Sequence, residues 1–170
     1  VIGDSLARIL EMKGNKVIRE NHVGDWGTPF GMLIERLEDL ESEGVQPSDA
    51  LADLGTFYRD ARASFDMDKK FRERARKRVV ALQSGDEATM ARWKQLVDIS
   101  FSYFDEVYDL LGVLLTKDDV RGESFYDPLL ASVVERLGEK DLLSNDSGAE
   151  VMYPGDWLNR EGNPLPLIIR

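Results

Sequence analysis

Four runs of apolar residues at helical spacing, between Phe30 and Leu111, constrain the fold of this chain most strongly. A spacing of three or four residues places apolar side chains on one face of a helix. Ser48, Asp68 and Asp86 stand at the expected starts of the last three runs, where their side chains can cap a helix. The runs therefore predict four consecutive helices with their apolar faces turned inward. Glycines mark the expected helix ends, at Gly44, Gly85 and Gly112.

The first part of the chain is patterned differently from this helical region. Residues 1–13 carry an apolar stripe that predicts a helix, and Gly14 is its expected end. Residues 16–22 predict a short strand, and two glycines and a proline make 24–29 a loop. A helix, then a strand, then a glycine-rich loop is the order of an α/β unit.

The last part of the chain returns to short strands after one more helix. The helix is expected over 126–137. The expected strands are 113–116, 141–144, 150–153 and 165–169. The predicted fold class is α/β, dominated by helices with a few short strands. Three parts are expected: a helix-strand-helix unit, a mainly helical insertion, and strands that return to the sheet. Their ranges are 1–45, 46–138 and 139–170.

Charge and composition exclude several classes of protein. The 170 residues hold 22 Lys and Arg against 32 Asp and Glu, for a net charge of −10. This acidity argues against a protein that coats nucleic acid non-specifically, although a local basic face stays possible. The chain has no cysteine and one histidine, so it lacks a disulfide scaffold, a thiolate zinc site and a Cys nucleophile. No membrane span or signal peptide is expected, which indicates a cytoplasmic protein.

Residues 21–28, with the sequence NHVGDWGT, carry the most chemistry. An amide, an imidazole and a carboxylate follow the expected strand, and ligands bind at that end of strands in open α/β sheets. One interpretation is a pocket for a small polar substrate, with Asp25 available to a cation and His22 to an anion or hydroxyl. The alternative is a tight turn in which Trp26 packs in the core and Asp25 caps the next helix. The residue pattern leaves both open.

Residues 69–78 form a basic segment in an acidic chain, with seven basic residues and one acidic residue among ten. On a helix these side chains leave a cationic outer face, which suits contact with a phosphate backbone. The candidate nucleic-acid-binding residues are Lys70, Arg74, Arg76 and Lys77. The alternative is a solvated face whose partners lie nearby in space.

Glu123 lies in a polar loop just before the last predicted helix. Its carboxylate can bind a substrate cation, or it can cap that helix. The chain contains no phosphate-loop pattern, no GxGxxG and no GxSxG elbow.

Five segments in order resemble the catalytic domain of arginyl-tRNA synthetases. They are 2–8 (IGDSLAR), 21–28 (NHVGDWGT), 79–86 (VVALQSGD), 121–126 (RGESFY) and 164–170 (PLPLIIR). The resemblance implies part of a class I synthetase catalytic domain of Rossmann type. Such enzymes are ligases of protein biosynthesis that join arginine to tRNA(Arg) through an arginyl-adenylate, using ATP and Mg²⁺. It implies arginine, ATP and tRNA(Arg) as partners of the parent enzyme, with no membrane.

The resemblance also implies which residues line the substrate pocket. They are Asn21, His22, Gly24, Asp25 and Gly27, beside the arginyl-adenylate. Trp26 matches the same motif but is expected to pack. Pro29 departs from the family pattern, because many members have Gln there. No catalytic residue and no metal ligand are assigned in this chain.

Both ATP-binding signatures of the family, H-x-G-H and K-M-S-K-S, are absent from these 170 residues. The chain is therefore expected to be an internal fragment that binds no cofactor and catalyses nothing alone. The alternative is a non-catalytic, synthetase-like module that binds tRNA or protein through 69–78. Exposed strand edges are expected to favour self-association.

Overall fold

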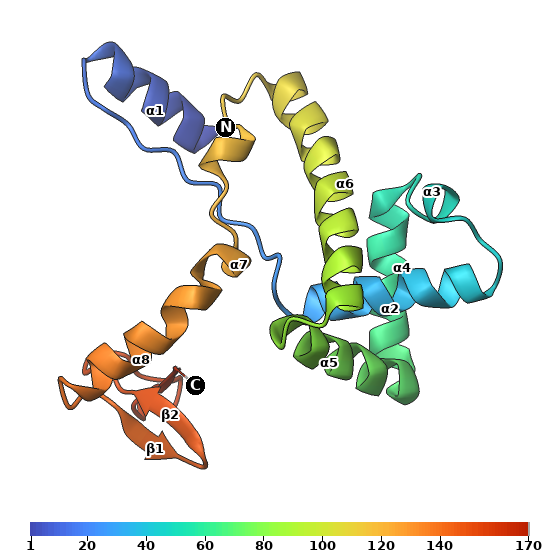
Figure 1. The fold of residues 1–170 in the computed structure, drawn as a ribbon. Helices are drawn as coiled ribbons and strands as arrows, with labels where there is room; N and C mark the ends of the chain where they lie inside the picture. Colours follow the sequence, from blue (N-terminus) through green and yellow to red (C-terminus); the bar gives the residue numbers. More distant parts are fainter. Residues whose placement is uncertain (170) are drawn as a thin grey trace. The chain divides into compact units, whose positions relative to one another are not determined.

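The computed structural model describes residues 1–169 and consists mainly of helices (Figure 1). The helices are α1 (Ile2–Met12), α2 (Thr28–Ser42), α3 (Pro47–Ala50), α4 (Leu54–Met67), α5 (Lys69–Gln83), α6 (Glu87–Leu111), α7 (Glu123–Tyr126) and α8 (Leu130–Gly138). Short 3-10 turns are η1 (Lys117–Asp119) and η2 (Asp127–Leu129). The strands are β1 (Ser144–Asp146), β2 (Ala149–Met152) and β3 (Leu167–Ile168). Arg170, the last residue of the 164–170 segment, lies outside the described residues.

Contacts divide the chain into two units, with the boundary between Phe125 and Tyr126. The three-part division at 45 and 138 stays a prediction. None of the helices in residues 1–169 combines the length and the apolar character that crossing a membrane requires.

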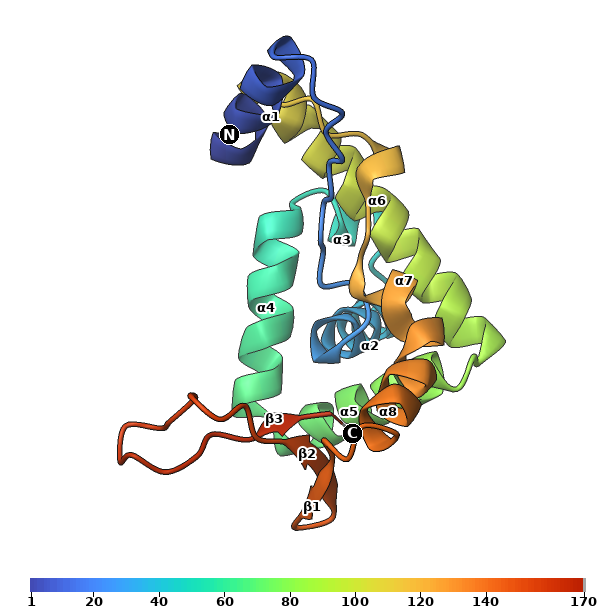
Figure 2. The same cartoon turned by 90° about the vertical axis from the view of Figure 1, so that its left-hand side faces the viewer.

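The first unit is built around α2, which Figure 2 shows nearly end-on with α4, α5 and α6 around it. Leu33, Ile34 and Leu37 of α2 are almost completely buried. Each such side chain contributes about 1.5–3 kcal/mol relative to an exposed one. Partners from the surrounding helices are Phe57, Ala61, Phe71, Ala75, Leu82 and Leu96. The predicted inward faces of α2, α4 and α5 thus form most of this core. The run in α6 contributes partly buried side chains such as Met90 and Trp93, and its last residue, Leu111, is exposed.

Two of the three predicted helix caps are confirmed. The Asp68 carboxylate accepts a hydrogen bond from the backbone N–H of Lys70 at the start of α5. The Asp86 carboxylate accepts from both the N–H and the hydroxyl of Thr89, and these bonds lower the pKa of Asp86. Gly112 ends α6 in the left-handed conformation, with φ of 63°, as its position after the last apolar residue predicts.

The third predicted cap, Ser48, is wrong. Pro47 takes the first helical position of α3, which suits its fixed φ, so Ser48 lies inside that short helix. The helix stops after Ala50, and α4 starts afresh with Asp53 as its cap, 3.0 Å from the N–H of Thr56. An Asp side chain that binds the backbone in this way competes with a continuous helix.

The predicted strands at 16–22 and 113–116 are not strands in the structure. Both segments lie in a non-helical conformation, and the single residue pair recorded near them is a parallel bridge between Asn21 and Val120. Period-two patterning favours an extended backbone, but a strand requires a row of hydrogen-bonded neighbours. Within residues 1–169 the backbone of Asn21 bonds to Asp119 and Arg121, but this pairing stops at the end of the first segment, so neither segment forms a strand.

The second unit, in its described residues 126–169, contains α8 and a three-stranded antiparallel sheet in the order β1-β2-β3. Ser147 and Gly148 link β1 to β2 with positive φ angles of 54° and 88°, a turn that matches the twist of a hairpin. The strand predicted at 150–153 overlaps β2 but is displaced from it by one residue, and the strand predicted at 165–169 contains β3. The strand predicted at 141–144 is wrong, because Asp141 adopts a positive φ and β1 begins at Ser144. The helix predicted over 126–137 is interrupted by η2 at Pro128.

Candidate functional site

The predicted pocket segment, residues 21–27, lies alongside residues 119–123, about 100 positions later in the chain. The backbone N–H of Asn21 donates to the carbonyl of Asp119 (2.8 Å), and the N–H of Arg121 donates to the carbonyl of Asn21 (3.0 Å). The N–H of Glu123 donates to the carbonyl of Val23 (3.0 Å). These bonds bring together two of the segments that the sequence singled out separately, NHVGDWGT and RGES.

Asp25 is buried, with 6% of its surface exposed, and its carboxylate binds the second segment. One carboxylate oxygen accepts from the N–H of Ser124 (2.9 Å) and the other from the Ser124 hydroxyl (2.6 Å). Asp25 therefore caps α7. The interpretation that it caps the next helix is wrong, because α2 begins after Gly27 without a side-chain cap. With both oxygens bound to Ser124, Asp25 is placed to hold the loop in position.

Glu123, for which the sequence left cation binding and helix capping open, lies beside the residues predicted to line the pocket. Its exposed carboxylate accepts a long hydrogen bond from the N–H of Trp26 (3.3 Å) and does not cap α7. A Cβ atom at Gly24 or Gly27 would lie only 3.5–4.0 Å from that carboxylate. Two glycines thus keep the space around Glu123 free of side chains, which favours the cation-binding alternative over the capping one.

Side chains of α6 support the pocket segment. The indole N–H of Trp93 donates to the carbonyl of Asp25 (2.6 Å), and the Trp93 ring contacts Trp26 edge to face with centroids 5.3 Å apart. The amide of Asn21 donates to the hydroxyl of Tyr108 (3.0 Å). Trp26 therefore packs, as expected, while His22 places its Nδ1 2.9 Å from the carbonyl of Arg121.

A cavity of about 120 Å³ lies beside residues 23–25. Its lining is largely apolar and includes Phe30, Phe101 and Phe104. At its polar end the hydroxyls of Tyr58 and Ser100 are 2.9 Å apart, and burial raises the pKa of Tyr58. The pocket segment thus has an apolar space on one side and hydrogen-bonded backbone along 119–123.

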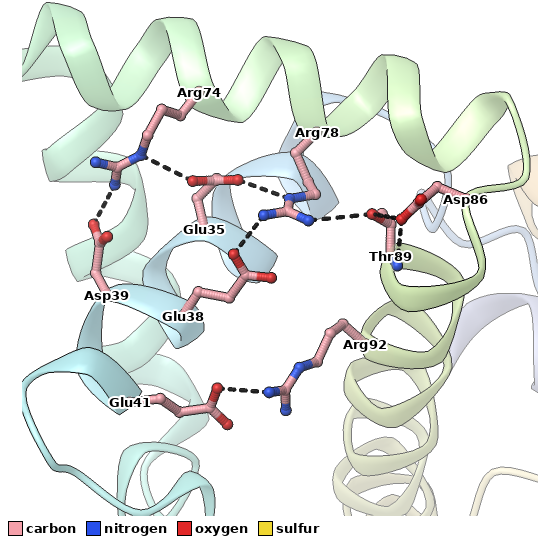
Figure 3. Close-up of polar contacts among 9 residues, drawn as sticks. All are labelled: Glu35, Glu38, Asp39, Glu41, Arg74, Arg78, Asp86, Thr89 and Arg92. Carbon is pink, nitrogen blue, oxygen red and sulfur yellow. Dashed lines mark hydrogen bonds and ion pairs between the residues drawn. The ribbon is translucent and has the colours of Figure 1, made fainter.

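The basic segment 69–78 forms most of α5, and part of its charge is paired with α2 (Figure 3). Arg74 contacts Glu35 (2.9 Å) and Asp39, while Arg78 contacts Glu35 (2.7 Å) and Glu38. The Glu35 side chain is 8% exposed, whereas the Arg74 and Arg78 side chains are 46% and 21% exposed, so the buried carboxylate is paired with guanidinium groups that still reach water. Burial raises the pKa of Glu38, and the charge of Arg78 opposes this. The alternative of partners nearby in space therefore holds for Arg74 and Arg78.

Lys70, Arg76 and Lys77 are exposed instead, and each lacks an ion pair within the described part of the chain. Nucleic-acid binding by these residues and by Arg74 stays a prediction. Of the four, Arg74 is the one whose charge is committed to α2.

A family model described as "tRNA synthetases class I (R), catalytic domain" matches residues 1–170. The chain belongs to this family. It is 53% identical over 171 residues to the arginine–tRNA ligase of Shewanella woodyi, and 48% identical over 170 residues to that of Thermobifida fusca. Both alignments cover 100% of this chain. The chain spans 29% of the first relative's length and 30% of the second's.

The family assignment agrees with a solved structure. Arginyl-tRNA synthetase from Plasmodium falciparum matches 96% of this chain with a TM-score of 0.71 and 30% sequence identity, over 28% of that enzyme's length. The helix-dominated α/β fold predicted for part of a class I synthetase catalytic domain is therefore confirmed. The resemblance to arginyl-tRNA synthetases is confirmed as well.

Gly122→Ala is expected to damage the contact between the two segments of the site. A Cβ atom at Gly122 would lie 2.6 Å from both carboxylate oxygens of Asp25, so the Asp25–Ser124 bonds must give way. Overpacking and a strained cap together cost about 1–3 kcal/mol. Urea denaturation of the chain, followed by circular dichroism, measures this loss.

Gly3→Ala is the matched control, because a Cβ at Gly3 in α1 meets nothing within 4 Å. It is expected to leave stability unchanged or slightly raised, since Ala favours a helix over Gly. Equal stability of the Gly122→Ala and wild-type chains would contradict the close approach of Asp25 to Gly122.

Proposed function

We propose that this chain is the part of an arginine–tRNA ligase that shapes the arginine side of the active site. The parent enzyme would activate arginine with ATP to arginyl-adenylate and transfer the arginyl group to tRNA(Arg), in the cytoplasm. The match of the family model to all 170 residues of this chain supports the reaction class. The exposed Glu123 carboxylate beside Gly24 and Gly27 supports the assignment to the arginine side.

Glu123 would bind the positive charge of the substrate. A carboxylate and a guanidinium match in shape and can form two parallel charge-assisted hydrogen bonds. The N–H of Trp26 fixes the carboxylate without neutralising its charge. The glycines on either side leave room for a ligand to approach.

The five motif residues would line the same pocket in different ways. Gly24 and Gly27 would keep it open, and Asp25 would hold the RGES loop through Ser124. Asn21 and His22 would fix the path of the segment, since their side chains contact Tyr108 and the carbonyl of Arg121. None of these roles requires proton transfer. Activation of a carboxylate by ATP depends chiefly on positioning and charge, so no catalytic residue is assigned.

ATP and Mg²⁺ are proposed for the parent enzyme and are given no site among the described residues. In residues 1–169 no three His, Asp or Glu side chains gather where they could hold a metal ion. The chain also has no phosphate-loop pattern. Because both ATP signatures of the family are absent from residues 1–170, these residues by themselves are expected to show no arginine-dependent ATP–pyrophosphate exchange.

A chimera tests the proposed function. Residues 1–170 replace the aligned 171-residue segment of the Shewanella woodyi arginine–tRNA ligase, to which they are 53% identical. We expect arginine-dependent ATP–pyrophosphate exchange in the presence of tRNA(Arg), within about tenfold of the unmodified enzyme, because the segment supplies the same contacts.

The outcomes separate the two functional alternatives. A folded chimera without exchange, alongside an active unmodified enzyme, would contradict the ligase assignment and favour the non-catalytic module. Exchange that depends on another amino acid would contradict the choice of arginine. Asp25→Asn in the active chimera is expected to lower ATP–pyrophosphate exchange, since the amide keeps one acceptor oxygen and replaces the other with an NH2 group, which cannot accept from Ser124.

A further inference from the structure

The cations of α5 divide into two groups with different surroundings. Arg72 donates to the carbonyls of Phe65 and Asp66, so it closes the turn between α4 and α5. Arg74 and Arg78 pair with the acidic residues of α2. The remaining four are exposed: Lys69, Lys70, Arg76 and Lys77.

These four residues form a compact arrangement on the outer face of α5, named here the outer α5 face. Seven residues are nearly two full turns of a helix and advance about 10.5 Å. Lys69 and Arg76 therefore lie in one row, and Lys70 and Lys77 lie in the next. Glu73 lies between the rows with its carboxylate 4.0 Å from Lys69, so one of the four positive charges is partly offset.

The outer α5 face is exceptional for this chain, whose net charge is −10. A polyanion is repelled by most of such a surface and attracted to the few places where positive charge collects. The inner arginines are held by α2, so they fix the helix and leave the outer cations free to contact a partner.

We propose that the outer α5 face is a docking surface for the phosphate backbone of RNA, and in the proposed ligase of tRNA(Arg). Three or four flexible cations along an exposed helix face suit contact with phosphates rather than with bases. The choice of RNA as the polyanion rests on the proposed function. The contact positions the RNA and carries no sequence readout, so it works alongside other contacts.

Binding of a fluorescein-labelled tRNA(Arg) transcript to the 170-residue chain tests the surface by anisotropy at 50–300 mM KCl. The logarithm of the association constant is expected to fall with the logarithm of salt concentration with a slope of about −3, one unit per phosphate contact. The triple variant Lys70→Glu, Arg76→Glu, Lys77→Glu is expected to bind about 100-fold more weakly at low salt. Its folding is expected to be unchanged, because all three side chains are exposed.

A second triple variant, Lys13→Glu, Lys16→Glu, Lys140→Glu, changes the net charge equally at exposed positions outside α5. It is expected to bind within about threefold of the wild-type chain, since distant charges are screened. Three results would each overturn the proposal. They are an equal loss of RNA affinity in the two triple variants, an RNA affinity that does not change with salt concentration, and no RNA binding at 50 mM KCl. If the chain binds phosphatidylglycerol vesicles as tightly as tRNA(Arg), and the α5 triple loses that binding, the surface would be assigned to membranes instead.

The chimera separates this proposal from the proposed function. In an active chimera the α5 triple is expected to raise the KM for tRNA(Arg) in aminoacylation about tenfold or more and to leave the KM for arginine unchanged. The chimera could be inactive while the 170-residue chain still binds RNA in a salt-dependent way and the α5 triple still weakens that binding. In that case the ligase assignment is wrong and the docking surface is supported. If the chimera is active and the α5 triple leaves its KM for tRNA(Arg) unchanged, the docking surface is wrong and the ligase assignment is not affected.

Discussion

Glu123→Gln is expected to raise the KM for arginine about 10- to 100-fold in the active chimera. Glutamine keeps the size of the side chain and an oxygen that can accept from the N–H of Trp26. It loses the negative charge that would bind a guanidinium. Hydrogen bonds to a charged group contribute about 1.5–3 kcal/mol, which corresponds to this range at about 1.4 kcal/mol per factor of ten. Exchange rates at varied arginine concentration measure it.

Citrulline sharpens this test, because it has nearly the shape of arginine without the charge. If Glu123 binds the guanidinium, the chimera prefers arginine to citrulline strongly, and Glu123→Gln reduces that preference. Glu139→Gln, at an exposed glutamate after α8, is the matched control and is expected to change neither quantity. An unchanged preference in a folded Glu123→Gln chimera would show that another group selects the charge.

Helix boundaries were predictable where the signal is local. Asp68 and Asp86 cap their helices through bonds to backbone groups two and three residues ahead, so the sequence alone contains both partners. Ser48 failed because Pro47, one residue earlier, is the better first helical residue, and Asp53 captures the next start. The spacing of apolar residues does not show which of two neighbouring capping signals determines where a helix begins.

The site was predictable only in parts. The sequence indicated chemistry at Asp25 and separately at Glu123, but nothing local joins residues whose partners lie 99 positions away. The role of Asp25 as the cap of α7 follows from the pairing of 21–23 with 119–123, which is a tertiary contact. Similarly, the positive charge of α5 was evident, but its division into paired and free cations depends on Glu35 of another helix.

Gly31→Ala is expected to be the most destabilising single substitution among those considered. Gly31 lies in α2 where that helix crosses α5, and a Cβ there would overlap the carbonyl oxygen of Ala75 and lie 2.6 Å from Cγ2 of Val79. A backbone carbonyl cannot rotate away as a side chain can, so the helices must separate. We expect a loss of about 3 kcal/mol or more, or a drop in Tm of about 10 °C.

Two further variants make the Gly31 test specific. Gly55→Ala in α4 places a Cβ in ordinary contact with Asp53 and Arg59, and is expected to change stability by less than about 1 kcal/mol. Val79→Ala combined with Gly31→Ala removes the side-chain overlap but leaves the carbonyl of Ala75, so it is expected to restore only part of the loss.

The same crossing holds the Glu35–Arg74 and Glu35–Arg78 pairs, because carboxylate and guanidinium meet only when α2 and α5 are this close. Gly31→Ala should therefore also release these arginines from α2. If the variant folds as stably as wild type, the close approach is wrong, and so is the division of α5 cations into paired and free. A large loss of stability, with Gly55→Ala neutral, would support the close approach of α2 and α5, across which Glu35 pairs with Arg74 and Arg78.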